Sequence, residues 1–220
     1  MGNTGRKRSE ELRTERKKQI LDSARKLFVT QGYDATTMQQ VVQDAGTSIG
    51  NCYFYFPNKE ALLHAIVEDI SQEIWNKVDE ASGHLPAGAT QLAVSFYVFI
   101  QVLLEQAEVF QLVFMGNAHI RLRLSFLEYF SGALKKYLEK HPDLLAYEDV
   151  DLAITAWSGA TVSVLERILE GHITYEKGAV ERFLVNWNLQ AFGIPDARVQ
   201  NALENLDRWL KTGSINDAST

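Results

Sequence analysis

Residues 32–63 read GYDATTMQQVVQDAGTSIGNCYFYFPNKEALL, and this stretch decides how the chain folds. The sequence predicts two short helices joined by a tight turn at Ala45-Gly46, where glycine tolerates the backbone angles that a tight turn requires. A third helix is expected to begin at Asn58, because an asparagine side chain caps the free N–H groups of a first turn. The pattern therefore predicts a helix-turn-helix followed by a longer helix.

The second short helix carries small and polar residues, Ser48, Gly50 and Asn51, where a helix built only for burial would be apolar. A helix that lies in the DNA major groove needs such residues, because amide side chains reach base edges and hydroxyl groups reach phosphates. The alternative interpretation of Gly50 is a glycine required by packing. The helix as a whole favours sequence-specific DNA binding.

The rest of the chain predicts an all-α fold of about nine to ten helices. Of its 220 residues, 46% are apolar and only four are proline, and apolar residues recur at spacings of three and four. The most apolar window, Leu92–Leu104, is shorter than the roughly 20 residues needed to span a membrane, so a buried helix is expected there.

Charge is distributed unevenly. Residues 1–60 hold ten Lys and Arg against seven Asp and Glu, whereas residues 61–220 hold twelve against twenty-one. A basic head on an acidic body confines the attraction to phosphate to one end of the molecule. Residues 1–9 and 214–220 are expected to be flexible tails. The first of these could lie along DNA or remain solvated.

Two domains are expected: a DNA-binding domain over residues 10–57 and a helical body over residues 58–213. A loop of small residues, 82–89, separates a continuous helix at 58–82 from the rest of the body. The remaining helices are expected over residues 10–31, 36–45, 48–54, 90–106, 108–115, 118–140, 148–171, 175–192 and 195–213.

Other functional classes find little support in the sequence. Cys52 is the one cysteine, so no disulfide within the chain and no cysteine-based metal site can form, which suits a reducing cytoplasm. The sequence has no phosphate-binding glycine loop, zinc-helix histidine pair or nucleophile elbow. We therefore expect a cytoplasmic protein without metal or cofactor. A helical enzyme and a membrane-surface protein remain as alternatives.

The head resembles the TetR/AcrR family of bacterial transcriptional regulators over roughly residues 15–65. The resemblance rests on an ordered set of residues: Gly32-Tyr33, Thr36-Thr37, Ala45-Gly46-Thr47-Ser48, Gly50, Tyr53, Tyr55-Phe56, Lys59-Glu60 and Leu62-Leu63. It implies a homodimer that binds a palindromic operator and has a divergent body that binds a small molecule. The protein would be a repressor that this small molecule releases from the operator. An activator, or a redox-responsive regulator acting through Cys52, stays open as an alternative.

The resemblance also implies which residues meet DNA. Thr37 would hold a phosphate at the start of a helix, Asn51 would pair with an adenine edge, and Ile49 would contact thymine methyl groups. The sequence departs from the usual pattern of base recognition because no arginine stands on the predicted recognition helix. The full set of expected contacts is Thr36, Thr37, Gln39, Thr47, Ser48, Ile49, Gly50, Asn51, Tyr53, Tyr55 and Lys59.

In the body, aromatic residues at helical spacing are expected to form core, but together they could enclose an apolar cavity for a largely apolar effector. A cation at the start of the 118–140 helix could meet an anionic group of that ligand. The expected pocket residues are Phe96, Tyr97, Ile100, Phe114, His119, Arg123, Phe126, Tyr129, Phe130 and Trp157.

The hairpin 148–192 is the expected dimer interface, because its small residues allow close helix approach and two copies would form a four-helix bundle. These residues could instead pack within one subunit. A two-fold dimer would place its recognition helices about 34–36 Å apart, or more on longer sites. A ligand that moves the 58–82 helix would change this spacing. The expected interface residues are Ala156, Gly159, Ala160, Ser163, Phe183, Leu184, Trp187 and Ala191.

Overall fold

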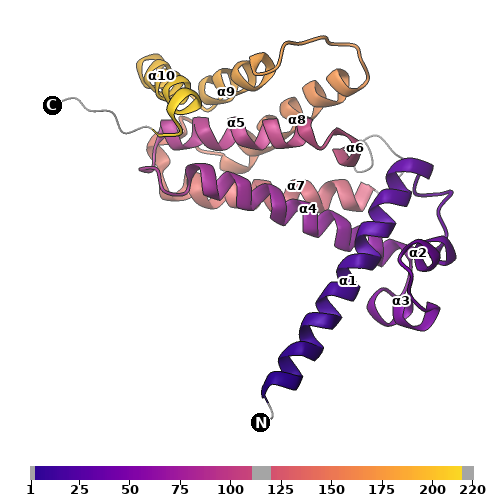
Figure 1. Ribbon diagram of the computed structural model, residues 1–220. Helices are drawn as coiled ribbons and strands as arrows, with labels where there is room; N and C mark the ends of the chain where they lie inside the picture. Colours follow the sequence, from indigo (N-terminus) through magenta and orange to yellow (C-terminus); the bar gives the residue numbers. More distant parts are fainter. Residues whose placement is uncertain (1–2, 111–119, 215–220) are drawn as a thin grey trace.

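The computed structural model describes residues 3–110 and 120–214, and its regular structure over these ranges is helical throughout (Figure 1). This confirms the predicted all-α class. The elements are α1 (Asn3–Gln31), α2 (Met38–Asp44), α3 (Ile49–Tyr55), α4 (Lys59–Ser82), α5 (Ala89–Glu105), α6 (Ala107–Phe110), α7 (Ile120–Lys140), η2 (Pro142–Leu144), α8 (Val150–Leu169), α9 (Ala179–Ala191) and α10 (Asp196–Thr212).

Helix α5 lies at the centre of the body. It packs against α4 on one side and against α9 and α10 on the other, while α7 packs against α4 and α8 (Figure 1). Its sequence explains this position, because apolar side chains surround most of the helix and such a helix is stable only when it is covered on several sides. The body is thus a layered bundle built around α5.

The head consists of the C-terminal part of α1 together with α2 and α3. Its buried side chains are continuous with those of α4, so head and body share one apolar core. The residues that form this junction are Ile20, Ala24, Phe28, Val41, Cys52, Phe56, Leu62, Leu63 and Ile66.

Helix α4 runs without interruption from the head into the body, as the sequence predicts. The Asn58 Oδ1 atom accepts a hydrogen bond from the Ala61 N–H at 2.7 Å and so caps its first turn. Its apolar stripe continues from Leu62 to Ile74, and the helix ends at Ser82. Helix α4 therefore connects the head directly to the body.

Helix α1 is longer than predicted, because it begins at Asn3 and not near Glu10. Residues 3–9, predicted as part of a flexible tail, belong to this helix. No proline interrupts the segment, and its Lys, Arg and Glu residues favour a helix. The side chains of residues 6–19 are exposed, and this half of α1 projects away from the body on the side of α3 (Figure 1).

A further boundary differs from the prediction. Helix α9 begins at Ala179 and not at Tyr175, because Gly178 adopts a left-handed conformation (φ +86°) immediately before it. The short helix predicted at 108–115 corresponds to α6, which the structure describes as far as Phe110. Phe114 and His119, which were predicted to line a ligand pocket, lie outside the described residues.

Candidate DNA-binding interface and ligand cavity

Reciprocal hydrogen bonds fix the start of α2. The Thr37 Oγ1 atom accepts from the Gln40 N–H at 3.3 Å, and the Gln40 Oε1 atom accepts from the Thr37 N–H at 2.7 Å. This capping box satisfies two backbone donors that the helix cannot satisfy itself. Thr37 and the neighbouring Gln39 remain exposed, so both are accessible to a partner.

Thr36, in contrast, faces inward. Its side chain is buried, and its hydroxyl group donates to the Gly32 carbonyl oxygen at 2.8 Å, with the Leu27 carbonyl oxygen at 3.3 Å. The prediction that Thr36 contacts DNA is wrong, because this hydroxyl group closes the end of α1. Of the two adjacent threonines, Thr37 alone keeps an exposed side chain.

The turn before α3 positions the second helix. Gly46 adopts a left-handed conformation (φ +58°), and the Ser48 Oγ atom then accepts from the Asn51 N–H at 3.2 Å. Cys52 and Phe56 are buried and anchor the helix to the head. Burial raises the pKa of the Cys52 thiol, which favours its protonated form.

The opposite face of α3 is open. Ile49 is 47% exposed and Tyr53 48%, and a Cβ atom added to Gly50 would meet no described atom within 4 Å. Packing within the subunit therefore does not require a glycine at this position. Phe54 is 73% exposed, and sequence reasoning missed it. At 100° per residue it lies far around the helix from Cys52, which is the signal that could have identified it.

The other predicted contacts of the head are less accessible. Thr47, Asn51 and Tyr55 are half-buried, and the Thr47 hydroxyl oxygen is enclosed without a hydrogen-bond partner among the described residues. Tyr55 packs against the core. These residues lie on or beside α3, but they offer DNA less surface than Ser48, Ile49 and Tyr53.

Lys59 has a different role from the predicted phosphate contact. Its Nζ atom donates to the carbonyl oxygens of Tyr33 at 2.7 Å, Thr36 at 3.0 Å and Asp34 at 3.3 Å. The same atom lies 4.3 Å from the centre of the Tyr33 ring, a cation–π distance. An ammonium group has three donors, so the loop between α1 and α2 occupies all of them. Lys59 tethers this loop to α4.

A cavity of about 300 Å³ lies in the body between α4, α5, α7 and α8. Its walls are mainly aromatic and aliphatic, with a polar edge formed by α4 and α5. The lining residues are Trp75, Val78, Asp79, Ser82, Gly83, Gln91, Leu92, Ser95, Phe96, Phe99, Phe130, Ala133, Leu134, Tyr137 and Trp157. Its size and apolar walls suit a small organic ligand.

The polar groups of the cavity are partly engaged with one another. The Ser95 hydroxyl lies 2.8 Å from the Ser82 hydroxyl and 2.8 Å from the Gln91 carbonyl oxygen, to which it can donate. The Tyr137 hydroxyl accepts from the Gly88 N–H at 2.8 Å. Burial raises the pKa of the Tyr137 phenol, which keeps it neutral.

Three of the predicted pocket residues, Phe96, Phe130 and Trp157, line this cavity. The other predicted pocket residues that the structure describes do not line it, because a helix turns most of its side chains away from any one wall. Tyr97 and Ile100 are buried elsewhere in the core, and Phe126 lines a separate small void.

The prediction was also wrong for Tyr129 and Arg123. The Tyr129 side chain is exposed, and its hydroxyl reaches the Gln72 Oε1 atom at 3.4 Å. The Arg123 Nη2 atom lies 3.4 Å from the Glu166 Oε1 atom, so this cation pairs with α8 outside the cavity. The cavity instead includes α4 residues, notably Trp75 and Asp79, which sequence reasoning missed because their spacing fits a helix surface equally well.

The sequence of the head matches a known family. Residues 20–66 match the model of the bacterial regulatory proteins of the tetR family. The chain is 41% identical over 64 residues to the HTH-type transcriptional regulator QacR of Staphylococcus aureus, a match that covers 28% of this chain and 34% of QacR. It is 35% identical over 66 residues to the HTH-type transcriptional repressor Rv1474c of Mycobacterium tuberculosis, covering 30% and 35%. Over residues 20–66 the chain is therefore similar to the DNA-binding head of the tetR family.

Solved structures of other proteins share the fold of the body as well as that of the head. RolR in complex with resorcinol superposes with a TM-score of 0.64 at 20% identity, covering 88% of this chain and 95% of RolR. FadR of Bacillus subtilis in complex with stearoyl-CoA gives 0.66 at 19% identity, covering 79% and 97%. The matched region spans about a third of the curated relatives QacR and Rv1474c, at 34% and 35% of their length. The relatives QacR and Rv1474c are transcriptional regulators.

Helices α8 and α9 each leave part of their surface exposed. Ala156, Gly159 and Ser163 form an exposed stripe on α8, and Ala160 beside them is half-buried. Helix α8 is also long and apolar enough to cross a membrane by length and composition, with a third of its most apolar window buried. An apolar helix with one uncovered face is equally what a subunit interface requires.

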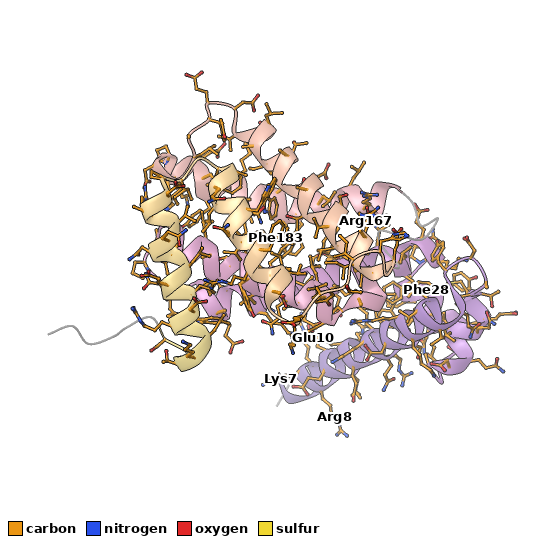
Figure 2. The ribbon with its side chains drawn as sticks, turned by 90° about the horizontal axis from the view of Figure 1, so that it is seen from above. Lys7, Arg8, Glu10, Phe28, Arg167 and Phe183 are labelled. Atoms are coloured by element: carbon orange, nitrogen blue, oxygen red, sulfur yellow. The ribbon has the colours of Figure 1, made fainter. Side chains whose placement is uncertain are left out.

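On α9, Phe183 is 58% exposed (Figure 2). Trp187, four residues later on the same helix, is 37% exposed. Ala191 is half-buried at the end of the helix. Leu184 is fully buried, so its prediction as an interface residue is wrong. It lies on the opposite face, where α9 packs against α5.

Head and body are also joined by side-chain hydrogen bonds. The Arg25 Nη2 atom of α1 donates to the Gln106 Oε1 atom at 3.0 Å, and the Gln106 Nε2 atom donates to the Glu73 Oε1 atom of α4 at 3.0 Å. Gln106 caps the end of α5, the central helix whose other residues line the cavity. The orientation of α1 is therefore linked to two helices of the cavity wall.

Proposed function

We propose that this protein is a ligand-responsive transcriptional regulator, and most simply a repressor. In this proposal a homodimer binds a palindromic operator and leaves it when a small molecule enters the body. The observation that carries the proposal is one continuous helix, α4, whose first half packs in a TetR-family head and whose second half lines a cavity. Such a regulator acts on DNA in the cytoplasm, whose reducing conditions suit a single unpaired cysteine.

The exposed face of α3 supports the assignment of DNA contacts. Ser48 and Tyr53 present hydroxyl groups suited to phosphates, and Asn51 presents an amide suited to an adenine edge. Ile49 and the more exposed Phe54 provide apolar surface for thymine methyl groups. Since α3 has no Lys or Arg, the proposed readout favours A·T pairs.

Phosphate attraction is assigned to α1 and to the start of α2. The exposed half of α1 carries seven Lys and Arg against three Glu, and Figure 2 places Lys7 and Arg8 near its far end, well away from Phe28. A cationic helix of this kind gains affinity by releasing counterions from DNA. Thr37 at the start of α2 adds an exposed hydroxyl group.

Release would follow from movement of α4. A ligand between α4 and α5 presses on Trp75, Val78 and Asp79, three and four residues apart on one side of α4. The head would follow this movement, and the hydrogen bonds through Gln106 would transmit it to α1. The ligand can shift the equilibrium only by as much as its affinities for the two head spacings differ.

Selection from random duplexes, followed by binding titrations at several salt concentrations, tests the proposal. We expect a palindromic, A·T-rich consensus and a log–log salt slope that reports several phosphate contacts. Tyr53→Phe should weaken binding to all duplexes alike. Asn51→Ala should also relax the preference at one base position, by about 1–3 kcal/mol. No consensus, or an equal loss for both variants on every duplex, would contradict the assignment.

A further inference from the structure

The described lining of the cavity carries negative charge and no positive charge. Among the described side chains that line it, Asp79 is the charged group, and neither Lys nor Arg is present. No described residue forms a salt bridge or a side-chain hydrogen bond with the Asp79 carboxylate, which lies at the exposed edge of the cavity. An anionic ligand would therefore meet a negative charge, and the described lining offers no cation to compensate it.

The walls of the cavity are rich in aromatic side chains. Six lining residues are aromatic, and several are in mutual contact: the ring centres of Phe96 and Trp157 lie 5.6 Å apart, those of Phe99 and Trp157 6.1 Å, and those of Phe99 and Phe130 4.8 Å. Aromatic faces attract cations, most strongly that of tryptophan, and the attraction grows when the cation is shielded from water. Trp75 and Tyr137 complete the set.

At the polar edge of the cavity, the side-chain atom that is left without a described hydrogen-bond partner is an acceptor. The Gln91 Oε1 atom is buried and receives no hydrogen bond from the described residues, while the hydroxyl groups of Ser82 and Ser95 are engaged with neighbouring acceptors. The Trp157 Nε1–H is a buried donor without a described partner. It is neutral, so it suits a ligand hydroxyl or ether oxygen without reversing the sign of the site.

We propose that the cavity binds a monovalent organic cation: a compact quaternary or protonated amine on an aromatic body. The positive group would lie among the rings near Asp79, and the body of the ligand would fill the apolar remainder. This inference rests on the proposed function of the cavity as the effector site, and it names the chemical class of that effector. It also reverses the expectation of an anionic partner, since Arg123 pairs with Glu166 instead.

Three phenols of matched shape test which ligand charge the cavity prefers. They are 3-(trimethylammonio)phenol, 3-tert-butylphenol and 3-hydroxybenzenesulfonate, which carry a positive, a neutral and a negative group. Binding to the full-length protein is measured by calorimetry and by tryptophan fluorescence, because Trp75 and Trp157 line the cavity. We expect the ammonium compound to bind about tenfold more tightly than its neutral isostere or better. We expect no saturable binding of the sulfonate.

The variant Asp79→Asn keeps the shape of the side chain and removes its charge. It should weaken binding of the ammonium compound about three- to tenfold and leave 3-tert-butylphenol unchanged. Glu80→Gln is the matched control, since Glu80 is exposed next to Asp79 and outside the cavity lining, and it should change neither affinity. Tighter binding of the neutral or anionic phenol, no saturable binding of the ammonium compound, or insensitivity to Asp79→Asn overturns the proposal.

These measurements contain no DNA, so they separate the inference from the proposed function. If the ammonium compound binds as expected but leaves operator affinity unchanged, the ligand class stands and ligand-driven release is wrong. If stearoyl-CoA or resorcinol releases operator DNA while the ammonium compound does not bind, release stands and the assigned ligand class is wrong.

Discussion

Lys59 holds its ammonium group on three carbonyl oxygens of the loop between α1 and α2, and it is half-buried there. Lys59→Ala should lower the free energy of unfolding by about 1–2 kcal/mol, because hydrogen bonds from a charged donor are lost and the carbonyls lose their partner. Denaturant unfolding measures this change. DNA affinity should fall with it for all sequences, since the loop positions α2.

Lys136→Ala is the control for this effect, because Lys136 is exposed on α7 and forms no described hydrogen bond or ion pair. Its stability and DNA affinity should match those of the original protein. If Lys59→Ala instead weakens DNA binding without changing stability, Lys59 contacts phosphate directly and its tethering role is wrong.

At the scale of the element, α3 has seven residues and depends strongly on its cap, since short helices are marginal without external stabilisation. Ser48→Ala removes the acceptor for the Asn51 N–H and should cost about 1 kcal/mol. Ser48→Asp keeps a capping oxygen and adds a negative charge that faces DNA. It should keep the melting temperature of the original protein and still bind DNA weakly, because its carboxylate repels phosphate.

These two variants separate capping from DNA contact. The melting temperature and operator affinity are measured for both, with Thr212→Ala, near the C-terminal end of α10, as a control far from the head. Strong DNA binding by Ser48→Asp would show that Ser48 does not face the phosphate backbone.

At the scale of the whole molecule, the exposed face of α8 and α9 predicts the oligomeric state. Phe183→Lys combined with Trp187→Lys should convert a dimer into a monomer of 24.8 kDa in sedimentation velocity, because two buried rings would be replaced by repelling charges. Leu124→Lys is the matched control, since Leu124 is also an exposed apolar residue but lies on α7. A dimer that survives the double substitution would place the interface elsewhere.

Local patterns were sufficient to predict the head. The cap at Asn58 and the turn at Gly46 depend on residues within three positions of the backbone that they serve, so the sequence predicted them directly. The continuity of α4 followed from an apolar stripe without a breaker. The same locality explains why α1 was predicted too short: without a cap or a breaker, nothing in the sequence marked its start.

The cavity and the roles of individual polar residues depended on long-range packing. Thr36 and Thr37 are adjacent and chemically identical, and only the position of the α1 end decides which hydroxyl group faces inward. Lys59 meets acceptors 23 to 26 residues earlier in the chain, a distance at which sequence spacing carries no information.

By itself the sequence determined the helices, the head and its outward face, because caps, turns and periodicity act over a few residues. Only the tertiary structure decided which aromatic residues enclose a cavity, that Asp79 and not Arg123 lies on its wall, and that Leu184 is buried while Phe183 is exposed. The physical reason is that each helix offers several apolar or polar faces. Which face is covered depends on the helices that pack against it.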